Sequence, residues 1–85
     1  MRNVNELLLA TDAATRYLHH YVENDRGYTS QDVQAGIQRL RSLCRELEQT
    51  EKPSWQYAQA AMAILDTAET CIEQAQDRLA GVRPE

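Results

Sequence analysis

The stretch TSQDVQAGIQRLRSLCRELEQ, residues 29–49, decides the fold. Thr29 is followed three residues later by Asp32, a spacing typical of the capping box that begins a helix. Beyond this start, apolar side chains recur at alternating steps of four and three residues, which places them on one side of a helix. The stretch therefore predicts an amphipathic helix over 30–49. Its apolar positions are Val33, Ile37, Leu40, Leu43, Cys44 and Leu47.

A second helix is predicted before this stretch. Asn3 and Glu6 have capping-box spacing, and the apolar positions that follow recur near 3.6 residues. The pattern predicts a helix over 3–23, followed by a turn in which Gly27 supplies a positive φ. The expected core side of this helix consists of Val4, Leu7, Ala14, Leu18 and Tyr21.

A third helix is predicted after a break at Pro53, with Ser54 as an alternative cap. We expect it to span 54–80, with Gly81 as the residue after its end and 81–85 as a tail. Its stripe again follows steps of three and four, and alanine fills most of it, so that a neighbouring helix can approach closely. The stripe consists of Ala58, Ala61, Leu65, Ala68, Ile72, Ala75 and Leu79.

These helices predict a single all-α domain over 1–85, an antiparallel three-helix bundle with a long third helix. The composition agrees, since the chain has only 85 residues, three glycines, two prolines and no phenylalanine. The third helix would be about 40 Å long against about 30 Å for each of the others, at 1.5 Å per residue. One of its ends should therefore extend past its neighbours or meet a partner.

Charge and hydropathy argue against several classes of protein. The net charge is −4, and the positive footprint that a nucleic-acid binder needs is not visible. The longest apolar runs fall far short of the roughly 20 residues of a membrane span. The first residues also lack the apolar region of a signal peptide. We therefore expect a soluble, cytoplasmic protein without a nucleic-acid or membrane partner.

Chemistry-bearing residues are sparse, and the sequence predicts a protein that is not an enzyme. His19 and His20 are adjacent, so they point about 100° apart on a helix and cannot share a metal. Cys44 and Cys71 have no nearby cysteine or histidine to complete a zinc site, and buried reduced thiols are favoured over a disulfide. We expect no catalytic residue, no cofactor and no metal.

The best candidate for a binding surface lies on the predicted third helix. Trp55 and Met62 are seven residues apart and lie away from its apolar stripe. They are either covered by the other two helices or form a face for a partner protein. A ridge of like charges follows them, which is either a solvated face or a contact for a basic partner. The ridge consists of Asp66, Glu69, Glu73 and Asp77.

A further candidate is the group of Tyr17, His20 and Tyr21 at the end of the first predicted helix. Tyrosine is enriched at protein interfaces, and it is also common at the edge of a core. The edge of the core is the favoured interpretation.

Residues 40–72 carry a family resemblance. LRSLCREL at 40–47 leads to Pro53, to the pair Gln56-Tyr57, and on through an alanine-rich helix. This arrangement resembles the small co-chaperones of type III secretion needle subunits, as does the segment NELLL at 5–9. The resemblance implies a helical hairpin in the cytoplasm that holds an aggregation-prone helical subunit together with a second chaperone.

Three functions are therefore weighed. The first is a non-enzymatic helical module, adaptor or chaperone-like, that binds a partner protein through the third helix, or a second copy of the chain as a homodimer. The alternative is a small acidic inhibitor that uses residues 66–77 against a basic target, such as an immunity or phage-encoded anti-host protein. The third is a DNA-associated regulator that uses the helix over 30–49.

Overall fold

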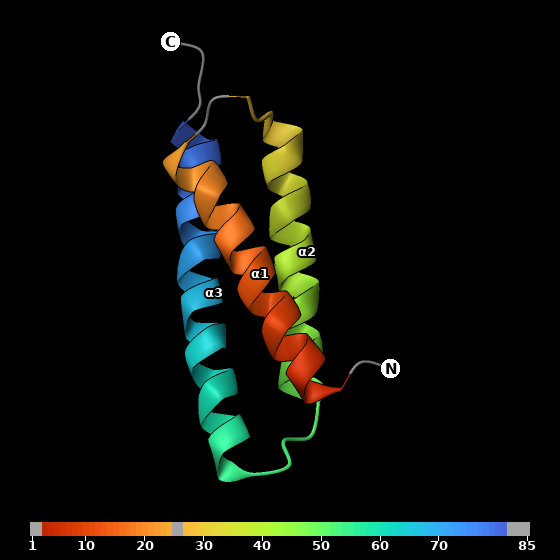
Figure 1. Ribbon diagram of the computed structural model, residues 1–85. Coiled ribbons are helices and arrows are strands. Elements are labelled where there is room, and N and C mark those ends of the chain that lie inside the picture. The colour runs from red at the N-terminus through yellow and green to blue at the C-terminus, as the bar shows by residue number, and fades with distance from the viewer. Residues whose placement is uncertain (1–2, 25–26, 82–85) are drawn as a thin grey trace.

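The structure, a computed structural model, describes residues 3–24 and 27–81. Three helices follow one another: α1 (Val4–Glu23), α2 (Ser30–Gln49) and α3 (Trp55–Gly81). Figure 1 shows that they run up, down and up, with α1 inclined across the other two. Every pair of helices is in contact. The prediction of an all-α antiparallel three-helix bundle with a long third helix is confirmed.

Both predicted capping boxes are present. The side chain of Asn3 accepts from the backbone N–H of Glu6 at 2.9 Å. The hydroxyl of Thr29 accepts from the N–H of Asp32 at 3.1 Å, and the Asp32 carboxylate accepts from the N–H of Thr29 at 3.1 Å. Between the two helices, Gly27 has the expected positive φ, at 82°.

The ends of α3 differ slightly from the prediction. Ser54 is its cap, because the N–H of Tyr57 donates to the Ser54 hydroxyl at 3.4 Å and the N–H of Ala58 to the Ser54 carbonyl at 3.1 Å. The prediction that Gly81 follows the helix is wrong. Gly81 is its last residue and keeps right-handed backbone, a conformation open to glycine as to any residue. The rest of the predicted tail, 82–85, lies outside the described residues.

The core forms where the predicted stripes meet. On α3 the buried positions include alanines spaced seven residues apart, Ala61, Ala68 and Ala75, which are at most 1% exposed. Their small size lets α1 and α2 approach α3 closely. On α2, Gly36 has the same effect toward α1, because a Cβ there would meet Leu18 at 3.2 Å. Gly36 therefore marks a close contact between α1 and α2.

Two threonines of α1 lie in the core of the bundle, although the sequence pattern did not predict them there. Thr11 and Thr15 are buried, although neither is apolar. The hydroxyl of Thr15 donates to the carbonyl of Thr11, one turn earlier, at 2.7 Å. A threonine that satisfies its hydroxyl within its own helix can occupy a core position as a β-branched residue of valine-like shape.

The greater length of α3 leaves one end uncovered. It has 27 residues, against 20 in each of α1 and α2. Figure 1 shows its first turns extending beyond the start of α1. The segment that leads into this end is held by Lys52, whose ammonium donates to the last carbonyls of α2, those of Leu47 and Glu48. The expected overhang therefore lies at the end where Trp55 begins the helix.

Candidate protein-binding site

The outward side of α3 carries all six predicted partner-binding residues. At 100° per residue they fall within a sector of about 80°, on the side of the helix away from its buried alanines. All six side chains are exposed. We call this surface the outer face of α3. It consists of Trp55, Met62, Asp66, Glu69, Glu73 and Asp77.

Trp55 and Met62 form the apolar end of the outer face. Trp55 is 72% exposed and Met62 is 64% exposed. Of the two alternatives left open by the sequence, cover by the other helices is excluded, because the bundle leaves both side chains in solvent. Tyr57 and Ile64, nearer the stripe, are half-buried instead. The bundle therefore presents two large apolar side chains along the first turns of α3.

The acidic end of the outer face is partly balanced by α2. Glu69 and Glu73 line a shallow groove of about 390 Å³, and the α2 side of this groove carries Arg41, Arg45 and Glu48. The sequence showed only that the ridge lacks basic residues at i+4. The antiparallel packing of α2 on α3 brings these two arginines to it, which lowers the negative potential along one edge of the outer face.

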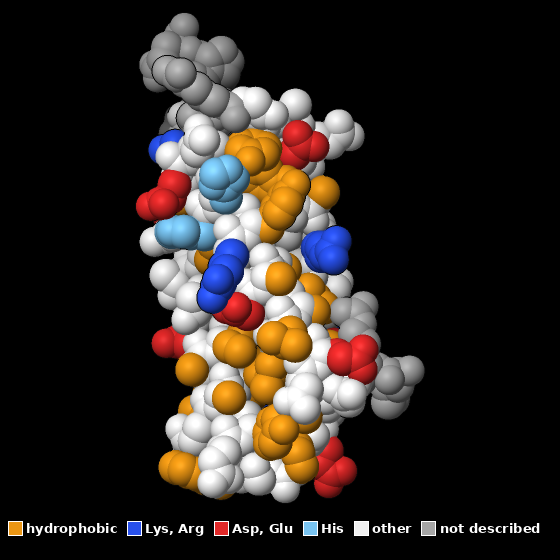
Figure 2. Space-filling view, in the orientation of Figure 1, with side chains coloured by type: hydrophobic (Ala, Val, Ile, Leu, Met, Phe, Trp, Pro, Cys, Tyr) orange, Lys and Arg blue, Asp and Glu red, His pale blue; other side chains and the backbone are white. Residues whose placement is uncertain are grey.

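A second apolar surface was missed by the sequence analysis. Leu9 and Tyr17 on α1 are 72% and 62% exposed, and Ala13 lies exposed between them. Figure 2 shows apolar side chains in a band along the face formed by α1 and α2, with charged side chains on both flanks. The run Leu7-Leu8-Leu9-Ala10 was the available signal, because consecutive apolar residues on a helix cannot all face one core.

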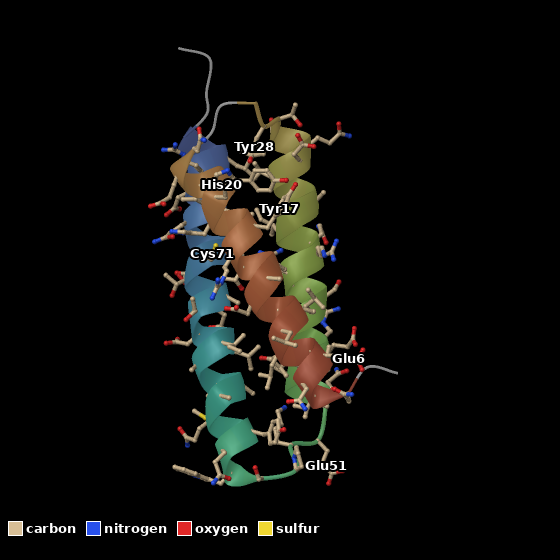
Figure 3. The ribbon with its side chains drawn as sticks, viewed as in Figure 1. Glu6, Tyr17, His20, Tyr28, Glu51 and Cys71 are labelled. Carbon is tan, nitrogen blue, oxygen red and sulfur yellow. The ribbon has the colours of Figure 1, made fainter. Side chains whose placement is uncertain are left out.

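The aromatic residues at the end of α1 divide between core and surface. The ring of Tyr21 is buried and meets the rings of Tyr17 and Tyr28 edge to face, with centroids 4.9 and 4.0 Å apart. His20 lies near Tyr28 (Figure 3), and 5.8 Å separates the centroids of their rings. Burial, with the phenol of Tyr17 nearby, raises the pKa of Tyr21 to about 12. Tyr21 is thus a core residue, whereas Tyr17 and His20 remain on the surface.

Both cysteines are free thiols inside the core. Burial raises the pKa of each thiol, and Glu48 and Glu69 raise the pKa of Cys44 further. A reactive cysteine needs a lowered pKa and access to solvent, so the environment of these two is that of structural thiols. The prediction that both cysteines are buried is confirmed.

The histidines stand apart from the thiols. His19 and His20 are exposed on α1, and His19 lies 3.5 Å from the carboxylate of Glu23. Within residues 3–24 and 27–81, no three His, Cys, Asp or Glu side chains gather closely enough to hold a metal ion. None of the helices described here is long and apolar enough to cross a membrane.

No protein-family model matches the chain, and no curated protein or solved structure matches it at a significant level. The surfaces described above are therefore the only guide to its function.

Proposed function

We propose that this protein is a non-enzymatic helical binding module, adaptor or chaperone-like, that engages a partner protein through the outer face of α3. One observation carries the proposal: Trp55 and Met62 stay exposed after the bundle has formed its core. Covering apolar surface is worth roughly 25 cal/mol per Å², and tryptophan is the residue most enriched among interface hot spots.

The layout of the outer face favours an elongated partner. Its apolar end and its acidic end follow one another along a single helix, from Trp55 to Asp77. A partner helix that carries an apolar patch followed by basic residues would match both ends. A role in holding a helical subunit, which the resemblance to needle-subunit co-chaperones implies, is consistent with this shape.

The test is a binding measurement with substitutions at the apolar end. Proteins that the tagged wild-type chain retains from its source cells are identified, and the dissociation constant of each is measured with purified components. Trp55→Ala and Met62→Ser should each weaken binding at least about tenfold, as interface anchors do. Their melting temperatures should match that of the parent, because neither side chain supports the core.

The matched control is Leu9→Ala, which removes an equally exposed apolar side chain from α1. It should leave this affinity unchanged. A partner that binds the Trp55→Ala, Met62→Ser double variant as tightly as the parent chain would refute the proposal.

The acidic-inhibitor alternative has one observation in its favour, the exposure of Asp66, Glu69, Glu73 and Asp77 on one face. The dependence of binding affinity on salt concentration distinguishes the two functions. An apolar contact through Trp55 keeps its affinity as ionic strength rises, whereas a contact made by the acidic residues weakens steeply. Because Arg41 and Arg45 border two of these carboxylates, we favour the apolar contact.

A further inference from the structure

A ridge of exposed residues runs along α1 on the side away from α3. Leu9, Ala13 and Tyr17 follow one another at steps of four residues, the spacing that forms a packing ridge on a helix surface. Leu9 and Tyr17 are large and apolar, whereas the middle residue is small. A second helix can therefore approach closely at Ala13 and meet a bulky side chain on either side of it.

A groove borders this ridge. It has a volume of about 550 Å³ and runs between α1 and α2. Small residues form most of its floor, because Gly36 brings the two helices together, and Tyr17 and Tyr21 stand along it. The small residues are Ala10, Ala13, Ala14, Ala35 and Gly36, and the charged residues Asp32 and Arg39 of α2 complete the lining. The α1–α2 face thus offers both a ridge and a depression into which another ridge fits.

The ridge is also self-complementary. In a twofold-symmetric dimer, if residue i of one copy contacts residue j of the second, then residue j of the first copy contacts residue i of the second. About a twofold axis at Ala13, positions equally far before and after it face each other. Leu9 lies four residues before Ala13 and Tyr17 lies four residues after it, so Leu9 of one copy meets Tyr17 of the second. Both side chains are apolar.

Charge follows the same symmetry. Glu6 and His20 lie seven residues before and after Ala13, and both are exposed. With the ridge residues, they fall within a sector of about 80° on α1. Figure 3 places Glu6 at one end of the helix and Tyr17 and His20 near the other. An antiparallel pair sets each Glu6 against a histidine, whereas a parallel pair would set Glu6 against Glu6.

We propose that a second copy of this chain docks on the α1–α2 face, with the two α1 helices crossing antiparallel at Ala13. This surface is distinct from the outer face of α3, so the contact leaves Trp55 and Met62 available to a different partner. The proposal does not depend on the function of that outer face.

The size of the face sets the strength of the contact. α1 is about 30 Å long, and the molecule is 21 Å wide in its second dimension. A face of this size covers at most about 600 Å² on each copy, so the total lies at or below the lower limit of about 1,200 Å² for specific interfaces. We therefore expect a reversible dimer with a dissociation constant in the micromolar range.

The first experiment measures mass by sedimentation equilibrium between about 1 and 500 µM, which brackets a micromolar dissociation constant. The mass should rise from the 9.7 kDa of one chain toward twice that value. Ala13→Arg should raise the dissociation constant at least about 30-fold, because the long charged side chain blocks the crossing point. Met62→Glu, on α3, is the matched control and should leave dimerisation unchanged.

The second experiment fixes the register by cross-linking. In Ala13→Cys the two introduced thiols meet at the axis, within the roughly 7 Å between Cα atoms that a disulfide requires. Mild oxidation should therefore yield a covalent dimer. Leu9→Cys alone should form no covalent dimer on oxidation, because Leu9 faces Tyr17 of the second copy and not Leu9. The Leu9→Cys, Tyr17→Cys double variant should cross-link. The native cysteines do not interfere, since both are buried.

Three results would overturn the proposal. The first is a chain that stays monomeric over the whole concentration range, which would leave the groove to a different kind of partner. The second is a dimer that survives Ala13→Arg but dissociates in Met62→Glu, which would place self-association on α3. The third is cross-linking through Leu9→Cys in preference to Ala13→Cys, which would exclude the antiparallel register.

Discussion

The thiol of Cys71 on α3 donates to the backbone carbonyl of Thr15 on α1, with 3.5 Å between sulfur and oxygen. Both residues are buried, so this contact joins the two helices inside the core. The Thr15 hydroxyl is satisfied by Thr11, whose own hydroxyl is buried and finds no partner among the described residues. The α1–α3 contact therefore contains a short polar row with one unpaired group.

The unpaired hydroxyl predicts a stabilising substitution. Thr11→Val keeps the shape of the side chain and removes a buried polar group without a hydrogen bond, which should raise the free energy of unfolding by about 1 kcal/mol. Thr15→Val is the control and should give no such gain, because it deletes a satisfied hydroxyl. Urea unfolding followed by circular dichroism measures both. Equal stability of the two variants would contradict the structure at Thr11.

The buried thiols predict slow chemical modification. Burial raises the pKa of Cys44 and Cys71, so at pH 8 the reactive thiolate is scarce in the folded state. A chromogenic disulfide reagent should react slowly with the native protein and rapidly once urea unfolds it. A Leu9→Cys variant supplies an exposed thiol for comparison and should react at once. Rapid labelling of the native parent would show that the core opens readily.

The raised pKa values of Cys44, Cys71 and Tyr21 predict that the protein loses stability in alkali. Their pKa values are higher in the fold than in the unfolded chain, where they are about 9.0 for a cysteine and 10.0 for a tyrosine. Their contribution is therefore complete below pH 9 and declines as the pH rises from there toward the raised values, which for Tyr21 is about 12.

Unfolding free energies measured from pH 7 to about 11 test this decline. Tyr21→Phe keeps the buried ring and removes its titration, so the decline above pH 10 should become shallower in this variant. A decline as steep as that of the parent chain would assign the effect to other groups.

Leu40 and Leu9 give a matched test of the core. Leu40 is fully buried and Leu9 is 72% exposed. Leu40→Ala should lower the free energy of unfolding by about 2–5 kcal/mol, whereas Leu9→Ala should change it by no more than about 0.5 kcal/mol. Leu65, on the α3 stripe but only half-buried, should fall between the two. Thermal melts of the three variants check this order.

The sequence predicted the helices because their start signals are local. The capping boxes at Asn3 and Thr29 need only residues within one turn, and the apolar stripe of α2 repeats over its whole length. The sequence also identified Trp55 and Met62 as lying away from the stripe of α3. It could not identify Thr11 and Thr15 as core residues, because threonine is polar and its burial here depends on the packing of a neighbouring helix.

The amino-acid sequence by itself determined three helices, the residues that cap their starts and the apolar side of each, because these follow from hydrogen bonds and spacings within a single helix. Only the tertiary structure decided what each remaining face meets. Trp55 stays exposed because it lies on the side of α3 away from α1 and α2, near the end that extends beyond α1. Antiparallel packing sets Arg41 and Arg45 beside Glu69 and Glu73. Exposure at these positions depends on the relative length and inclination of helices far apart in the chain, which no local pattern encodes.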